Sequence, residues 1–269
     1  MIRSASSLLA RVAIVAALAV APGASSAAPS VFLEELTWTE VRDAIASGAT
    51  TAIVPVGGTE QSGPHMTLGK HNVRVRALAG RIASTLGNAI VAPVLAYVPE
   101  GSIDPPAGHM RYPGTLSVPA DVFERTLEAA ARSLKRAGFR DIVFLGDHGG
   151  TQASLQAVAK RLDRAWSSTP VRAHAIIEYY RATETTYRRA LAARGHSDAE
   201  IGTHAGLADT SLSLAVDAGI VRAEALKAPP RAADGTSGDP RASTKELGQP
   251  GVDAVVEASV EAIRRATRR

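Results

Sequence analysis

Residues 51–72 read TAIVPVGGTEQSGPHMTLGKHN, and this stretch decides both the fold and the place of a site. It opens at residues 51–56 with an apolar, β-branched run that is typical of a buried parallel strand. Two glycines at 57–58 then allow a tight turn. Three ionisable side chains follow the turn, namely Glu60, His65 and His71. Because loops at the carboxyl ends of parallel strands share a crevice, the pattern predicts a site, and the alternative is an ordinary polar loop.

Two later segments also place a histidine beside glycines in front of a predicted helix. GDHGGT at 146–151 follows another strand-like run and contains His148. THAGLADTS at 203–211 precedes an apolar helix and contains His204 and Asp209. In a parallel sheet these loops are expected to meet the first one in the same crevice.

The ionisable side chains of these loops form a candidate metal site made of Glu60, His71, His148 and Asp209. Two imidazoles with one or two carboxylates suit zinc or a similar divalent ion and leave a coordination position for water. Such an ion lowers the pKa of its water to about 7 and so supplies a nucleophile at neutral pH. His204 or Glu60 would then serve as the proton carrier.

The remainder of the chain alternates strand-like runs with helical patterns. The further strands are expected at 90–95, 141–145 and 171–177. Helices are expected at 37–48, 72–86, 120–137, 153–166, 212–216 and 252–267. Residues 227–249 are rich in Gly, Pro and Ser and are expected to form an irregular surface segment. The alternation predicts an α/β fold whose parallel sheet is covered by helices on both faces.

A long loop at 99–119 is rich in Gly and Pro and carries Glu100, Asp104 and His109. Loops of this length inside a compact domain are usually functional or disordered, and we expect this one to shape a pocket. The residues expected to contact a substrate are His65, His109, Gly149 and Gly150.

Residues 1–27 have the three-part layout of a secretory signal peptide. Two arginines precede an apolar run at 12–21, and a stretch of small residues follows at 22–28. We expect cleavage after Ala27 and export of a single domain, residues 28–269, to the periplasm or the medium. The apolar run is too short to span a bilayer comfortably, so no stable membrane anchor is expected.

Charge and cysteine content exclude several classes of function. Of the formal charge of +4, two positive charges belong to Arg3 and Arg11, and the first 27 residues contain no acid, which leaves +2 for the mature chain. A charge this small does not indicate binding to nucleic acid or to a membrane surface. The chain has no cysteine, so disulfides, thiolate nucleophiles and thiolate metal ligands are excluded.

Five motifs, in their order along the chain, resemble those of the creatininase (creatinine amidohydrolase) family. They are EQSGPHMTL from Glu60, YPGT from Tyr112, GDHGG from Gly146, HAGLADTS from His204 and GDPRA from Gly238. The resemblance covers nearly the whole predicted mature chain. It implies a three-layer α/β/α sandwich with a mostly parallel central sheet, a divalent-metal site, and hydrolysis of cyclic or linear amide C–N bonds. It also implies a homo-oligomer, commonly a hexamer.

The chain departs from the family pattern at metal-ligand positions. Glu60 and His148 match ligands directly, and Asp209 stands where the family has a glutamate. Ser62 and His71 replace a histidine and an aspartate, and that aspartate bridges two ions in the family. Because an imidazole nitrogen cannot bridge ions in that way, we expect one ion per chain, zinc or alternatively manganese.

Two functions follow from this comparison. In the first, the chain is an exported metal-dependent hydrolase of a small-molecule amide, and the resemblance assigns His204 to protonate the leaving nitrogen. In the second, it is an exported binding or scaffold protein of the same fold that has lost catalysis. The tryptophans that pack creatinine in the family are not evident near residue 200, so creatinine is not the expected substrate. A metal analysis of the mature protein separates the two functions.

Overall fold

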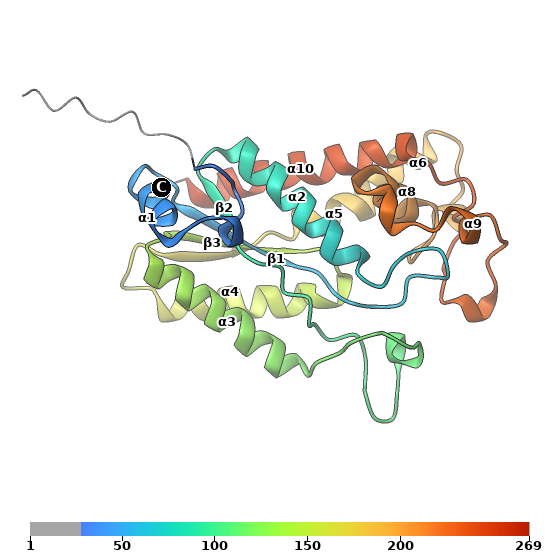
Figure 1. Cartoon of the computed structure of the whole chain (residues 1–269), viewed down its shortest axis with the longest axis horizontal. Coiled ribbons are helices and arrows are strands. Elements are labelled where there is room, and N and C mark those ends of the chain that lie inside the picture. Colours follow the sequence, from blue (N-terminus) through green and yellow to red (C-terminus); the bar gives the residue numbers. More distant parts are fainter. Residues whose placement is uncertain (1–27, 269) are drawn as a thin grey trace, which may run out of the picture.

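A sheet of parallel strands runs through the middle of the molecule (Figure 1). The structure, a computed structural model, describes residues 28–268. Within them the strands are β1 (Thr51–Val56), β2 (Ala89–Val91), β3 (Asp141–Gly146) and β4 (Arg172–Ala175), in the spatial order β2-β1-β3-β4. All three pairings are parallel, which confirms the parallel sheet expected from the sequence.

Helices cover both faces of the sheet and make the three layers visible in Figure 1. One face is covered by α2 (Lys70–Leu86), α5 (Glu178–Ala182), α8 (Leu207–Val216) and α10 (Lys245–Thr267). The other is covered by α1 (Trp38–Ala46), α3 (Ala120–Ala137) and α4 (Gln152–Ala165). Shorter helices are α6 (Arg188–Ala192), α7 (Asp198–Ile201) and α9 (Ala223–Leu226), with a π-turn at Thr183–Tyr187 and 3-10 turns at Leu33–Glu35, Gly108–Arg111, Gly149–Thr151, Ala218–Ile220 and Ala232–Asp234.

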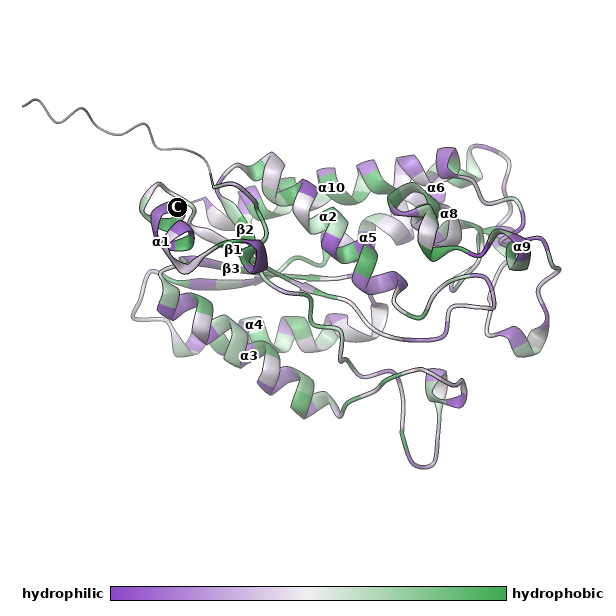
Figure 2. Cartoon of the chain, viewed as in Figure 1, coloured by the Kyte–Doolittle hydropathy of each residue, from purple (hydrophilic) through white to green (hydrophobic). Residues whose placement is uncertain are grey.

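Side chains of each central strand alternate between two hydrophobic cores. Ile53 and Val143 enter the core under α2 and α10, whereas Val54 and Phe144 enter the core over α3 and α4. Every residue of β1 and β3 is buried, which explains the continuous apolar runs in the sequence. Figure 2 shows hydrophobic and hydrophilic residues along different sides of α3, as expected for an amphipathic surface helix.

The C-terminal helix begins earlier than the sequence pattern predicts. It was expected at 252–267 but starts at Lys245, where the Thr244 side chain accepts the N–H of Leu247 at 3.1 Å. The segment from 245 to 251 looks like a loop in the sequence because it contains Gly248, Pro250 and Gly251. Here, however, the glycines permit a close approach to neighbouring side chains and backbone, so the helix continues through them.

Two predicted strands are shorter than expected. β2 ends at Val91 rather than at residue 95, because Pro93 has no N–H to donate to the ladder. The chain stays beside β1 through a single bridge between Leu95 and Val56. β4 covers only residues 172–175 of the predicted 171–177. His174 within it lies 2.9 Å from Asp141 Oδ1 and is a paired structural histidine.

The predicted signal peptide, residues 1–27, lies outside the described part of the chain. From residue 28 to 268, no helix has both the length and the apolar character needed to cross a membrane.

Candidate metal and active site

The site lies where β1 and β3 end and α2 begins. After β1, the N–H of Gly58 donates to Asn72 Oδ1 at 3.0 Å, and any side chain at Gly57 would collide with that amide. The glycines therefore let the strand turn directly against the first turn of α2. This turn delivers Glu60 and His71 to the same point, which is the carboxyl edge of the sheet.

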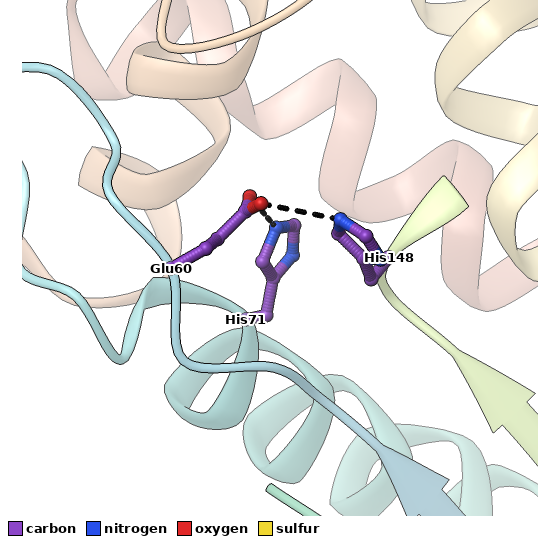
Figure 3. A group of neighbouring side chains, drawn as sticks. All are labelled: Glu60, His71 and His148. Atoms are coloured by element: carbon purple, nitrogen blue, oxygen red, sulfur yellow. Dashed lines mark hydrogen bonds and ion pairs between the residues drawn. The ribbon is translucent and has the colours of Figure 1, made fainter. Parts of the chain in front are cut away.

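Glu60 is fully buried at the centre of the site, and two imidazoles point at its carboxylate (Figure 3). Oε1 lies 2.8 Å from His71 Nε2, and Oε2 lies 3.2 Å from His148 Nε2. One ligand atom from each of these three residues falls within 4.8 Å of the other two, so the group has the size of a metal-binding site. Burial opposes ionisation of Glu60, but the polar contacts with the imidazoles of His148 and His71 and the charge of Lys70 outweigh it and hold its pKa below its ordinary value.

A buried carboxylate fixes the orientation of His71. The Nδ1 atom of His71 lies 2.7 Å from Asp147 Oδ2, which also accepts from Arg74 Nη2 at 2.6 Å. Tyr179 donates to the other oxygen of Asp147 at 3.1 Å. Burial opposes ionisation of Asp147, but the charge of Arg74 and the His71 bond hold its pKa below the usual value. His71 therefore donates from Nδ1 and turns the lone pair of Nε2 toward Glu60.

A second group of three also contains Glu60, together with His109 and His204. His109 Nε2 lies 3.1 Å from Glu60 Oε2, and His204 Nδ1 lies 3.7 Å from Oε1. The Gln61 amide lies between the rings, with Nε2 at 3.0 Å from His109 Nδ1. His204 Nε2 faces the main-chain carbonyl of Gln61 at 2.9 Å. It also lies 3.1 Å from the side-chain nitrogen of Gln61, but the two hydrogens of that nitrogen have other acceptors in His109 Nδ1 and the Gly235 carbonyl. Because a carbonyl only accepts and an amide nitrogen only donates, His204 carries its proton on Nε2 and His109 accepts at Nδ1.

Lys70 places a buried positive charge beside this centre. Its ammonium lies 2.5 Å from Asp209 Oδ2 and 3.6 Å from Glu60 Oε1. Arg74 pairs with the other oxygen of Asp209. Burial opposes ionisation of Asp209, but Lys70 and Arg74 keep its pKa well below the ordinary value. Asp209, predicted as a metal ligand, thus lies outside both groups of three, and its role as a ligand stays a prediction.

Glu100 is a member of the site that the sequence analysis left without a role. Its side chain is fully buried, and Oε2 lies 3.2 Å from His148 Nε2. Burial and the negative charge of Glu60 raise the pKa of Glu100 to about 9. The sequence places Glu100 in the long loop before His109, and this was the one indication of a role in the site. No motif in that loop distinguishes Glu100 from the other polar residues around it.

A cavity of about 170 Å³ opens beside the cluster. It is lined by the predicted Gly149 and Gly150 and by His204, with Tyr180 and Arg188 further along the wall. A Cβ at Gly150 would lie 2.8 Å from the ring of His148, and one at Gly149 would lie 2.7 Å from Tyr180 Oη. These glycines therefore leave room for the side chains around the cavity.

His65, which was expected to contact a substrate, lies away from this cavity. It is buried with only 1% of its surface exposed, and its Nε2 lies 2.9 Å from Thr210 Oγ1. His65 is not among the residues that line the cavity beside Glu60. Its predicted contact with substrate stays a prediction, and its visible partner is Thr210 in α8.

The fold and the order of these motifs agree with one family. The family model for creatininase, described as creatinine amidohydrolase, matches residues 34–263. The chain belongs to this family. Membership confirms the resemblance seen in the sequence and the α/β sandwich built around a parallel sheet.

Curated relatives match over shorter segments. The creatinine amidohydrolase of Pseudomonas putida is 34% identical over 119 residues, which cover 44% of this chain and 45% of that protein. The mycofactocin precursor peptide peptidase of Mycolicibacterium smegmatis is 36% identical over 115 residues, covering 41% and 44% respectively. The matched segments thus span less than half the length of these relatives.

Solved structures match over most of the chain. A manganese creatininase has a TM-score of 0.73 and 26% identity, and the match covers 89% of this chain and all of that one. A mutant creatininase of Zn-Zn type has a TM-score of 0.70 at 26% identity, with 89% and 99% covered.

Proposed function

We propose that this chain is a divalent-metal-dependent hydrolase that cleaves an amide C–N bond in a small molecule. The observation that carries the proposal is the arrangement of Glu60, His71 and His148 around one point. His71 donates from Nδ1 to Asp147 and presents Nε2 to Glu60, as metal-binding histidines with a carboxylate partner do. A carboxylate and two imidazoles are donors that suit zinc or manganese.

The ion is assigned to the group with His71 and His148, and not to the group with His109 and His204. His109 accepts at Nδ1 from the Gln61 amide, so its proton is on Nε2, the atom that faces Glu60. Binding an ion there would move that proton to Nδ1, where it would meet the amide hydrogens. Its proton position therefore suits His109 to donate to a carboxylate or to a substrate.

A single ion per chain is part of the proposal, and Lys70 supports it. The ammonium of Lys70 is buried between Glu60 and Asp209, where it already neutralises negative charge next to the cluster. A second divalent ion in contact with these carboxylates would lie close to that ammonium, and like charges in a buried site repel strongly. In this account Asp209 orients Lys70.

His204 is proposed as the proton carrier. When bound, a divalent ion polarises the amide carbonyl and lowers the pKa of a water molecule. Burial, helped by the charge of Lys70, lowers the pKa of His204 to about 4, so the ring is neutral at neutral pH. Its Nε2–H is held by the main-chain carbonyl of Gln61 at 2.9 Å, and Nδ1 is left to take up a proton from the water that attacks the amide carbonyl. From Nδ1 the proton passes to the leaving nitrogen, which lets the amine depart.

The substrate class rests on the relatives and on the cavity. Two matched proteins carry the names creatinine amidohydrolase and precursor peptide peptidase, and both names denote cleavage of C–N bonds of the amide type. A cavity of about 170 Å³ suits a small molecule or the end of a peptide. We therefore propose a cyclic or linear amide and leave its identity open.

The test uses the purified full-length chain, stripped of metal and then reconstituted with zinc or manganese. Bound metal is measured by elemental analysis after dialysis, and amine release is followed over a panel of cyclic and linear amides. We expect release only from reconstituted protein. If no ion binds after supplementation, the hydrolase proposal is overturned and the alternative of a non-catalytic binding protein gains support.

We also propose that residues 1–27 direct export and that the mature protein is a homo-oligomer. Support comes from the three-part pattern of the N-terminal segment and from the assembly implied by the family resemblance. Mass spectrometry of protein from its native source should show a start near Ala28, and an intact Met1 would contradict export. Light scattering of the purified protein measures the assembly, and a monomer at micromolar concentration would contradict it.

A further inference from the structure

Glu100 and His109 are brought together by the base of one loop. Between them the chain makes an excursion that is closed by two backbone bonds, from His109 N–H to Glu100 C=O at 3.2 Å and from Ala107 N–H to Ser102 C=O at 2.9 Å. The N–H of Glu100 donates to Ser117 Oγ at 3.0 Å, which anchors the other side. The Glu100 backbone is therefore fixed, and its side chain points inward from a defined position.

The turn after β1 leaves space for the Glu100 carboxylate. A Cβ at Gly58 would lie 2.5 Å from Glu100 Oε1 and 3.3 Å from the Val98 side chain. The absence of a side chain at Gly58 thus lets the carboxylate approach the centre of the site.

The carboxylate of Glu100 is buried without a compensating donor. Among the residues of the described chain, no group donates a hydrogen bond of good geometry to either of its oxygens. Its Oε2 lies 3.2 Å from His148 Nε2, and that nitrogen lies equally far from Glu60 Oε2. One ring nitrogen carries at most one proton, so it cannot serve both carboxylates. A buried carboxylate without donors is costly, unless a cation is bound beside it.

Glu100 lies outside both groups of three, but its Oε2 is 3.2 Å from the ligand atom of His148. We propose that Glu100 moves onto the bound divalent ion as a further ligand and completes a site of two carboxylates and two imidazoles with Glu60, His71 and His148. The inference rests on the proposed function in one respect, namely that an ion binds at this cluster. The chain thereby regains a ligand after the family's histidine position became Ser62. Because oxygen donors suit manganese better than zinc, loss of Glu100 should weaken manganese binding more than zinc binding.

The experiment titrates the metal-free chain with Mn²⁺ alone and with Zn²⁺ alone, by calorimetry, in wild type and in Glu100→Gln. Removing a residue that only hydrogen-bonds a metal ligand typically lowers metal affinity by roughly 10–100-fold. Because Glu100 is proposed to bind the ion directly, we expect Glu100→Gln to lose more metal affinity than that. The matched control is Glu184→Gln, the same substitution in the wall of the cavity beside the cluster, which should bind metal as wild type does.

A second measurement separates a ligand from a structural residue. Without metal, Glu100→Gln should melt at the same temperature as wild type or higher, because it removes a buried carboxyl group that makes no hydrogen bond within the described residues. Gly58→Ala, which keeps Glu100 but moves its carboxylate, should weaken metal binding as well, and the double variant should lose less than the sum of the single losses.

The outcomes distinguish the two proposals. If wild type binds an ion and Glu100→Gln binds it equally well, Glu100 is not a ligand and the proposed function stands. If metal-free Glu100→Gln melts well below wild type, its role is structural and the inference fails. If wild type itself binds no ion, the proposed function fails and the inference fails with it.

Discussion

Proton positions decide what each histidine in this site is able to do. His71 donates a hydrogen bond from Nδ1 to Asp147, and His204 donates one from Nε2 to the main-chain carbonyl of Gln61. The two rings therefore present a lone pair to the centre through different atoms, Nε2 in His71 and Nδ1 in His204. Every histidine ring is able to bind a metal or to carry a proton. The hydrogen-bond partner of the nitrogen that faces away from the centre decides which of these roles each ring is suited to.

The first prediction at the residue scale compares His148→Ala with His204→Ala. Loss of His148 removes a proposed ligand, so bound metal and turnover should fall together. Loss of His204 should leave the metal in place and lower turnover by roughly 10²–10⁴-fold, the usual contribution of general acid–base catalysis. Bound metal, melting temperature and turnover are measured on the same preparations.

Leaving-group chemistry provides the control for this comparison. The effect of His204→Ala should be smallest on amides whose leaving nitrogen is a weak base, because such a group departs with little protonation. A His204→Ala protein with normal turnover per bound ion would end the proposed role.

The second prediction concerns His65 and acid stability. Burial and the charge of Lys70 lower the pKa of His65, and Asp209 and the Ala205 carbonyl only partly oppose them. As the pH falls, His65 is therefore protonated in the unfolded chain before it is protonated in the folded chain. The stability that His65 contributes is complete above about pH 6.5, the ordinary histidine pKa, and should decline as the pH falls from there toward the lowered pKa of the folded chain. His65→Gln should show a smaller drop in melting temperature between pH 7.5 and pH 5. An unchanged drop would contradict it.

Some of these residues are visible in the sequence and others are not. Glu60 and His148 follow strands and glycines, and the carboxyl-edge rule places such residues at a common site. Glu100 and Lys70 follow no such rule. Glu100 reaches the site because a closed loop and the space above Gly58 direct it inward, and both depend on contacts distant in sequence. Lys70 is a rare buried lysine, and its burial follows from pairing with Asp209 across the fold.

At the scale of elements, long amphipathic helices and buried strands were predictable, and their ends were less so. The ends predicted at residues 37 and 86 agree with the structure, where a capping box at Thr37 and Glu40 and a left-handed Gly87 act through local geometry. The predicted start of α10 was wrong because residues 227–249, rich in Gly, Pro and Ser, were expected to be irregular. The reason for a glycine at 248 is a tertiary contact, which a local pattern does not contain.

The third prediction tests that reason in α10. A Cβ at Gly248 would collide with the Ser211 carbonyl in α8, which is backbone and has little freedom to move. Ala is favoured over Gly in a helix by about 0.5–1 kcal/mol. Overpacking here should outweigh this gain by costing about 1–3 kcal/mol. We expect Gly248→Ala to lower the free energy of unfolding, measured with urea.

The control is Gly69→Ala at the start of α2. A Cβ there meets only the Asn72 amide at 3.7 Å, so stability should change by less than about 0.5 kcal/mol. Gly248→Ala as stable as wild type would show that α8 and α10 separate readily.

At the scale of the whole molecule, the sheet and the helices on one face assemble a balanced group of charges. The carboxylates at the centre are Glu60, Glu100, Asp147 and Asp209. The permanent cations that contact them are Lys70 and Arg74. Without an ion, the raised pKa of Glu100, about 9, keeps its carboxyl protonated at neutral pH. If Glu100 ionises on binding the ion, as its proposed role as a ligand requires, and the histidines are neutral, four negative charges face two positive ones, which leaves the charge that a single divalent ion neutralises. These residues come from segments spread between β1 and α8, so only the complete fold creates the balance.

The last prediction follows from this balance. Because buried charges remain stable only when they are compensated, the folded chain should hold one divalent ion tightly and should not retain a second. Elemental analysis of the full-length protein, after loading with excess Zn²⁺ or Mn²⁺ and extensive dialysis, should return about one ion per chain, the number for which the ligand set is complete. Two ions that both resist dialysis would show that His109 and His204 bind metal, and that Lys70 does not exclude a second ion.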